Sequence, residues 1–231
     1  LRVIFYVVGL LVLALGIILN TKSGLGVSPI ISVSYSISTI WNFNFGNMTF
    51  VLYTVFVIVE MILHTIWNRR EAAKESAALK PAARKSLPLI LGMDLLQLPL
   101  SLIFTRFMNL FSAWIPAPSY VFASQLLVLA GGIICTGIGA AMSLNMRIIP
   151  NPGDGIVQAI ADFIHKPVGF TKNCFDLFNI CITISVGMIF AHKLVGVGIG
   201  TVVAVLGVGR VIALFNHLFM KKMTEAAGVE Y

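Results

Sequence analysis

Long apolar runs recur along the whole chain, and charged residues are scarce between them. Charged side chains make up 11% of the 231 residues, whereas soluble domains average about 25%. Such runs suit a lipid bilayer, where every backbone amide must be hydrogen-bonded within the protein. Helices and closed β-barrels meet that condition, and the runs are continuous instead of alternating, which favours helices. The chain is therefore predicted to be an all-α, polytopic transmembrane protein in contact with the lipid bilayer.

The apolar sequence divides into eight segments, and two of them are too short to span a membrane. A helix needs roughly 20 residues to cross about 30 Å of hydrocarbon. At about 1.5 Å per residue, the segments at 29–41 and 152–164 reach only about 20 Å. A polar stretch containing Gly or Pro precedes each of them. The eight segments are residues 3–19, 29–41, 48–67, 87–115, 120–144, 152–164, 172–190 and 195–220.

The two halves of the chain share Gly and Pro positions at one constant offset. Pro29 and Pro152 open the two short segments (152 − 29 = 123), and each follows a residue that caps helices well, Ser28 or Asn151. This pattern predicts an internal duplication, with residues 1–115 as the first repeat, 120–220 as the second and 221–231 as a C-terminal tail. The other pairs are Gly9 and Gly132, Gly16 and Gly139, and Gly46 and Gly169.

Basic residues predict which loops face the cytoplasm. The loop at 68–86 holds six Lys or Arg against two Glu, and the tail carries Lys221 and Lys222, so both are expected on the cytoplasmic side. The uncharged loop at 113–119 fits the outside. These assignments agree if the short segments are re-entrant, which predicts inverted repeats with six full spans. Short helices that cross fully would put the basic loop and the tail on opposite sides, and that alternative stays open.

The net charge of +7 follows from these loops and from contact with anionic lipid. It does not indicate a nucleic-acid partner.

Short motifs that contain Gly or Pro occur at several places along the chain. They are Gly-Leu-Gly-Val-Ser-Pro at 24–29, Phe45-Gly46, Leu-Gln-Leu-Pro at 96–99 and Val-Gly-Ile-Gly-Thr at 197–201. Over nearly the whole chain they resemble the YczE/YyaS/YitT-type family of small bacterial integral membrane proteins. Asp154 matches that family's acidic turn in the second half, whereas Ile31 stands at the equivalent position of the first half. The resemblance implies a location in the bacterial inner membrane and implies no reaction.

The starts of the two short helices are the first candidate for a solute site. A helix that begins inside the membrane presents unpaired N–H groups and the positive end of its dipole. Paired, interrupted helices of this kind form the binding sites of many transporters. We therefore expect Ser28 and Asn151 to mark a site near the bilayer midplane that suits an anion or a carboxylate. Lys22 and Arg147 precede these starts and add positive charge, or else extend to the membrane interface.

Polar side chains on one face of each short helix extend this candidate site. Asp154 and Gln158 are four residues apart, so they share a helix face, and Ser32 and Tyr35 lie at comparable places in the first half. For Asp154, a purely structural role as a helix cap is the alternative. The predicted solute-binding residues are Ser28, Ser32, Tyr35, Asn151, Gly153, Asp154 and Gln158.

Ionisable residues inside the long spans are the candidates for ion coupling. A charge in mid-bilayer is costly, at least about 2.5 kcal/mol on insertion scales, so partners are expected. One interpretation is a set of structural Asp–Arg pairs, and the other is proton or cation coupling. The coupling candidates are Asp154, Asp176, Asp94 and Arg210. Glu60 is expected near the cytoplasmic helix end in contact with solvent, and His64 at a helix end as an interfacial residue.

The sequence offers no further constellation that indicates chemistry. Cys135, Cys174 and Cys181 lie in apolar stretches without metal-ligand spacing, so no metal and no cofactor is predicted. No Ser/His or Cys/His arrangement is evident, and the chain is not expected to be an enzyme.

These features favour a secondary transporter of a small polar or anionic metabolite, with the site between the two interrupted helices. A solute or ion channel and a non-transporting membrane subunit of a larger complex are the alternatives. A homodimer is compatible with a bundle this small.

Overall fold

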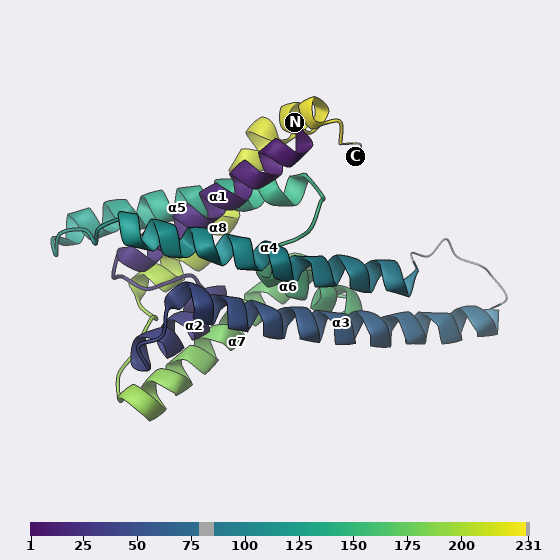
Figure 1. Cartoon of the computed structure of the whole chain (residues 1–231), viewed down its shortest axis with the longest axis horizontal. Coiled ribbons are helices and arrows are strands. Elements are labelled where there is room, and N and C mark those ends of the chain that lie inside the picture. Colours follow the sequence, from purple (N-terminus) through teal and green to yellow (C-terminus); the bar gives the residue numbers. More distant parts are fainter. Residues whose placement is uncertain (79–85, 230–231) are drawn as a thin grey trace.

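Helices make up almost all of the computed structural model, which describes residues 1–78 and 86–229 (Figure 1). The described part of the chain contains no β-strand, which confirms the predicted all-α class. In chain order the elements are α1 (Arg2–Lys22), α2 (Pro29–Ile40), α3 (Phe45–Ala78), α4 (Leu87–Trp114), α5 (Phe122–Asn145), α6 (Pro152–Ile164), α7 (Val168–Val186), the π-helix η1 (Gly187–Ala191), α8 (Ile199–Phe215), the π-helix η2 (Asn216–Met220) and α9 (Lys221–Ala227).

Six helical stretches are long and apolar enough to cross a membrane, as predicted. They are α1, the first part of α3, α4, α5, α7 continued by η1, and α8 continued by η2 and α9. The short helices α2 and α6 have 12 and 13 residues, so each reaches only about 18–20 Å. Large apolar side chains are exposed along the six long stretches, which is the surface that contact with lipid requires.

Two segments predicted as loop or tail are helical. α3 continues to Ala78, so the segment predicted as a basic loop at 68–86 begins as a helix, and Lys80, Arg84 and Lys85 lie outside the described residues. The predicted tail from 221 contains α9. Both helices are extended by residues with good helix propensity, mainly Ala, Glu and Lys.

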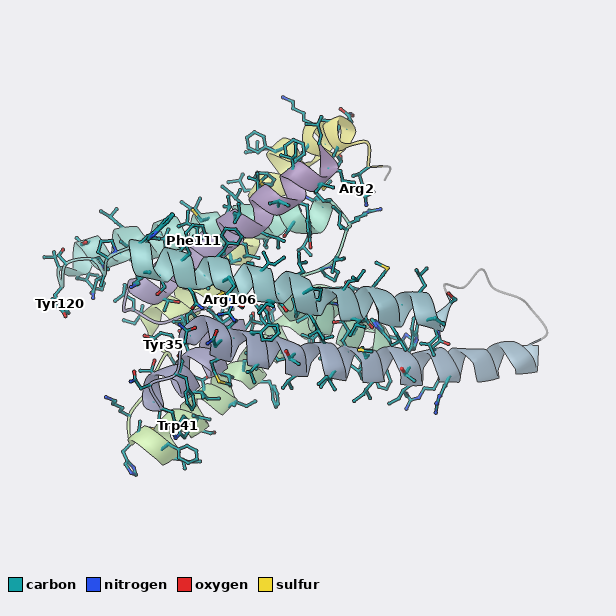
Figure 2. The ribbon with its side chains drawn as sticks, viewed as in Figure 1. Arg2, Tyr35, Trp41, Arg106, Phe111 and Tyr120 are labelled. Carbon is teal, nitrogen blue, oxygen red and sulfur yellow. The ribbon has the colours of Figure 1, made fainter. Side chains whose placement is uncertain are left out.

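The first and the last helix of the chain lie in contact with each other. Figure 1 shows the start of α1 beside α9 at the top of the view, whereas the ends of α3 and α4 that flank residues 79–85 lie toward its right edge. Figure 2 shows Tyr120, between α4 and α5, at the opposite end from Arg2. The predicted topology, in which the basic segment and the C-terminal segment share one side of the membrane, remains a prediction.

α1 and α5 form the most extensive helix pair and pack antiparallel through glycines. A Cβ atom added to Gly9 would lie 2.8 Å from the Ser143 backbone nitrogen, and one added to Gly132 would lie 2.7 Å from the Asn20 backbone nitrogen. Shifting the first contact by 123 positions gives the second, with the two helices exchanged. Any antiparallel helix pair gives such a relation, so the internal duplication and the inverted repeat remain predictions.

The Gly-rich motifs at 24–29 and 197–201 pack against each other, although they are far apart in sequence. Gly200 donates its backbone N–H to the Leu25 carbonyl at 2.7 Å, and Val27 donates to the Gly196 carbonyl at 3.0 Å. A Cβ on Gly198 would lie 2.4 Å from the Leu25 carbonyl oxygen. Glycine is therefore needed here because the two backbones touch, and the contact fixes the loop that leads into α2.

Serines hold α2 between α3 and α7. Ser32 and Thr183 share a hydrogen bond of 2.6 Å across the contact with α7, and Ser34 and Thr49 share one of 3.1 Å toward α3. All four side chains are fully buried. Hydroxyl pairs of this kind satisfy polar groups inside a membrane domain and allow helices to approach closely.

Candidate functional site

A cavity of about 470 Å³ lies among α3, α4, α6 and α7, with smaller contributions from α5 and α8. This volume is in the usual range of about 300–1,000 Å³ for small-molecule sites. Most of the wall is apolar, and the polar side chains come from two sides. They are Glu60, His64, Asp94, Gln97, Asp154, Gln158 and Lys172.

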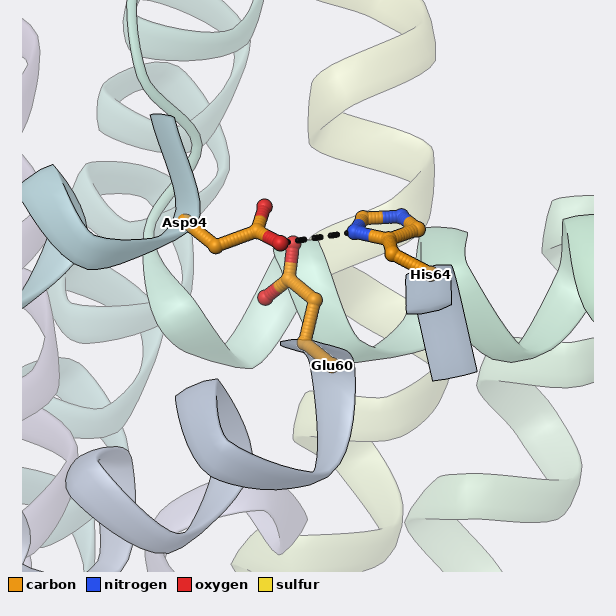
Figure 3. A group of neighbouring side chains, drawn as sticks. All are labelled: Glu60, His64 and Asp94. Carbon is orange, nitrogen blue, oxygen red and sulfur yellow. Dashed lines mark hydrogen bonds and ion pairs between the residues drawn. The ribbon is translucent and has the colours of Figure 1, made fainter. Parts of the chain in front are cut away.

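The first polar wall comes from α3 and α4. Glu60 and His64 are four residues apart on α3 and therefore share one face, which is turned toward Asp94 and Gln97 of α4. His64 Nδ1 lies 2.8 Å from Asp94 Oδ2, and Gln97 Nε2 donates to Glu60 Oε1 at 3.0 Å. Figure 3 shows the Glu60, His64 and Asp94 side chains converging. The wall thus combines two carboxyl groups, an imidazole and an amide.

This wall is buried, in contrast to the expectation for Glu60. The exposed fractions are 3% for Glu60, 4% for Asp94 and 1% for Gln97, so Glu60 is not in contact with solvent at a helix end. The reason is that α3 extends well beyond the membrane segment, which places Glu60 deeper in the bundle. His64 is also not a simple interfacial residue, because its ring contacts Asp94.

The second polar wall is the first half of α6. Asn151 accepts a hydrogen bond from the Gly153 N–H at 3.1 Å and caps the helix, while Pro152 has the restricted backbone that suits the first helical position. Asn151 is only 6% exposed, so α6 begins inside the bundle. From this start, Asp154 and Gln158 lie one turn apart and both face the cavity, as their spacing predicts.

α7 supplies the cation of the site. Lys172 lines the cavity and interacts electrostatically with Asp154 and with Asp176. Asp176 is 6% exposed, does not line the cavity, and its Oδ1 has no hydrogen-bond partner. Two predicted coupling residues, Asp154 and Asp176, are thus brought near the same lysine.

The structure places the other predicted solute-binding residues outside the cavity wall. Ser32 is paired with Thr183, Asn151 is a helix cap, and Tyr35 packs edge-on against Phe45 with ring centroids 5.6 Å apart, near the labelled Trp41 (Figure 2). Ser28 and Gly153 are also absent from the wall. α2 contributes no residue to it, because α2 is packed between α3 and α7, whereas α6 borders the open space.

The two short helices nevertheless meet at their starts. A Cβ on Gly153 would lie 3.2 Å from Ile30 Cδ1, and these two residues are equivalent at the offset of 123. The predicted closeness of the two helix starts therefore holds, although an apolar contact occupies it.

Within the described ranges, Arg106 and Arg210 do not form the structural pairs considered for the buried aspartates. Asp94 contacts His64, and Arg106 donates to Asn47 Oδ1 at 2.9 Å. Arg210 is exposed on α8, away from the cavity wall. α4 turns Asp94 and Arg106 to different sides, because 12 residues rotate the helix by about 120° beyond three full turns, and Arg106 lies on the exposed side.

Sequence reasoning missed Glu60, His64, Gln97 and Lys172 as parts of one site. The spacing of Glu60 and His64 was a signal, since two titratable groups four residues apart share a helix face. What the sequence lacked was the partner helix, because only the packing of α3 on α4 brings Asp94 to them. Donor atoms of Glu60, His64 and Asp94 all lie within 4.8 Å of one another, although no metal-binding cluster was predicted.

Fold and site together define a polytopic helical membrane protein with a mostly apolar cavity that contains three carboxyl groups. The chain belongs to the DUF6198 family, described as a family of unknown function, whose family model matches residues 1–217. No curated protein and no solved structure matches the chain. The resemblance to the YczE/YyaS/YitT-type family remains a prediction.

Proposed function

We propose that this chain is a secondary transporter of a small polar solute, which binds in the cavity beside the start of α6. The observation that carries the proposal is the cavity itself, a space of about 470 Å³ inside a bundle of six candidate spans. Polar and ionisable groups inside a membrane domain are expensive and mark solute or ion pathways. This cavity concentrates seven of them.

The sequence predicted a small polar or anionic metabolite, and the charges of the wall favour a polar solute with a positive group over an anion. Glu60, Asp94 and Asp154 supply three carboxyl groups, against Lys172 and the imidazole of His64. The start of α6 is also less available to an anion. The Asn151 side chain accepts from Gly153, and Asp154 stands in the first turn, where it meets the positive helix end.

The inverted repeat provides a route for alternating access. The matching starts of α2 and α6 support two repeats related by a two-fold axis in the membrane plane. In this proposal α2 and α6 are re-entrant helices, and rocking of one repeat against the other exposes the cavity to either side. The basic flanks of α3 and α4 and the C-terminal segment lie in the cytoplasm, as expected from the distribution of Lys and Arg in a bacterial inner membrane protein.

Asp154 is the residue whose change tests the solute site. We expect primary amines or amino acids to raise the melting temperature of the purified wild-type chain, because a ligand that binds only the folded state stabilises it by mass action. In Asp154→Asn the stabilisation should fall by at least about half, since the charged contact is lost. Glu225→Gln, at an exposed position on α9, should behave as wild type. Carboxylates without an amine should give a smaller shift.

Proteoliposomes then separate the classes of function. A transporter accumulates the stabilising solute against its gradient when an inward proton or cation gradient is applied, and accumulation stops when the gradient is collapsed. Equilibration without accumulation would indicate a channel. No stabilisation and no flux with any of these solutes would refute the proposed site and favour a subunit that acts within a larger complex.

A further inference from the structure

The side chains of Glu60, His64 and Asp94 bring three possible metal-ligand atoms close together. Its three donor groups come from two helices and lie within 4.8 Å of one another. Figure 3 shows Glu60 and Asp94 meeting in front of the His64 ring. Bound metals are held at about 2.0–2.3 Å by nitrogen and oxygen ligands, so a group of this size can close around one ion with small side-chain rotations.

Two buried oxygen atoms next to the cluster have no hydrogen-bond partner. They are Glu60 Oε2 and Gln97 Oε1, on side chains that are 3% and 1% exposed. A Cβ on Gly155 would lie 2.7 Å from the first and 3.0 Å from the second, so both atoms are directed to the same place. A buried acceptor without a donor costs about 1–3 kcal/mol, and a cation beside these atoms would remove that cost.

The cluster also lacks a permanent cation. Within the described ranges, the ion pair to Asp94 is made by His64 alone, and no Lys or Arg forms one with Glu60 or Asp94. Lys172 interacts electrostatically with Asp154 and Asp176, and no ion pair joins it to Glu60 or Asp94. Two carboxyl groups therefore share one imidazole as their nearby titratable partner, which leaves room for additional positive charge.

We propose that Glu60, His64 and Asp94 bind one divalent first-row transition-metal ion, with the Gln97 carbonyl oxygen as a fourth donor. A set of one imidazole nitrogen and three oxygens suits Mn²⁺, Fe²⁺, Co²⁺ or Zn²⁺, whereas Mg²⁺ and Ca²⁺ prefer oxygen ligands alone. The ion takes the place of the proton between His64 Nδ1 and Asp94 Oδ2. The inference rests on the proposed function only in placing the ion in the cavity proposed for the solute. Binding of the ion can be measured without transport.

Metal titration of the purified full-length chain in detergent tests this site. We expect about one Mn²⁺ or Zn²⁺ per chain by calorimetry, bound at least about tenfold more tightly than Mg²⁺ or Ca²⁺. Glu60→Gln, His64→Gln and Asp94→Asn should each weaken binding at least about tenfold, because each removes one ligand. The controls His217→Gln and Glu225→Gln change exposed residues of the C-terminal helical segment and should bind as wild type.

A spectroscopic measurement on the wild-type chain covers the case in which a variant does not fold. X-ray absorption of the zinc-loaded protein should show a nitrogen and oxygen shell with the scattering pattern of one imidazole and no sulfur. Absence of stoichiometric binding in the folded wild type, equal affinity in the folded variants, or a shell without imidazole would each overturn the inference. Metal binding without solute accumulation in proteoliposomes would support the metal site and refute the transporter proposal. Solute accumulation without metal binding would support the transporter proposal and refute the metal site.

Discussion

At the scale of single residues, the site depends on a glycine as much as on its charged groups. Gly155 on α6 lies against the carboxyl group of Glu60 and the amide of Gln97, so the two polar walls of the cavity touch there. No larger residue fits without moving one wall. The sequence indicated Asp154 and Gln158 through their spacing, but it gave no reason to single out Gly155, because its neighbours come from other helices.

Gly155→Ala should weaken both the fold and the site. The added methyl would lie 2.7 Å from Glu60 Oε2, so we expect a loss of about 1–3 kcal/mol in the free energy of unfolding, as for other overpacked positions, together with weaker Mn²⁺ binding. Thermal unfolding and calorimetry measure the two effects.

The matched control for this change is Gly92→Ala on α4, two residues from Asp94. A Cβ at Gly92 meets nothing within 4 Å, so the variant should keep the wild-type metal affinity, and its melting temperature should stay unchanged or rise slightly through better helix propensity. Equal behaviour of the two variants would mean that Gly155 does not position Glu60 and Gln97.

At the scale of elements, close packing of α1 on α5 fixes the frame around which the other helices gather. Both helices are about half buried, more than any of the other candidate spans. Gly16 and Gly139 allow this contact, because a Cβ on either would lie 2.3 Å from a backbone nitrogen of the opposite helix. Helices in membranes commonly associate through small residues that allow their backbones to approach closely. The hydrophobic effect does not favour helix–helix contacts over helix–lipid contacts there.

Gly139→Ala should therefore destabilise the bundle by about 1–3 kcal/mol, because the two backbones must separate to admit the methyl group. Gly131→Ala lies on the same helix and meets nothing within 4 Å, so it should leave stability unchanged or raise it slightly through its better helix propensity. Thermal unfolding in detergent compares the two. A stable Gly139→Ala variant would contradict the packing of α1 on α5.

At the scale of the whole molecule, the short helices decide the topology. If α2 and α6 are re-entrant, the six spans place both chain ends and the basic segment on one side, and residues after α6 return to that side. If α6 crossed fully, the segment at 165–167 would be on the opposite side. The lengths of α2 and α6, 12 and 13 residues, favour the first arrangement, which remains a prediction.

Labelling of single cysteines in intact cells measures this topology. In a chain whose three native cysteines are replaced, Ser86→Cys, Lys166→Cys and Glu225→Cys should react with a membrane-impermeant maleimide only after the cells are opened. Ser119→Cys, an exposed residue between α4 and α5, should react from outside. Reaction of Lys166→Cys from outside, with Ser86→Cys protected, would show that α6 crosses the membrane and would refute the re-entrant arrangement.

The sequence by itself determined the class, the six spans and the starts of both short helices. These follow from local quantities: the length of an apolar run, the preference of Ser, Asn and Pro for helix starts, and the spacing of Asp154 and Gln158. Each is decided by a residue and its near neighbours in the chain, so no knowledge of packing was needed.

Only the tertiary structure decided which polar groups form one cavity. Glu60 and Asp94 belong to different helices, and their contact depends on how α3 and α4 pack, which no local pattern encodes. The packing of α2 between α3 and α7 made Ser32 a helix contact, and of the two short helices only α6 borders the cavity. The free energy of packing whole helices against one another determines which residues line a buried site. The role of each residue therefore depends on that packing.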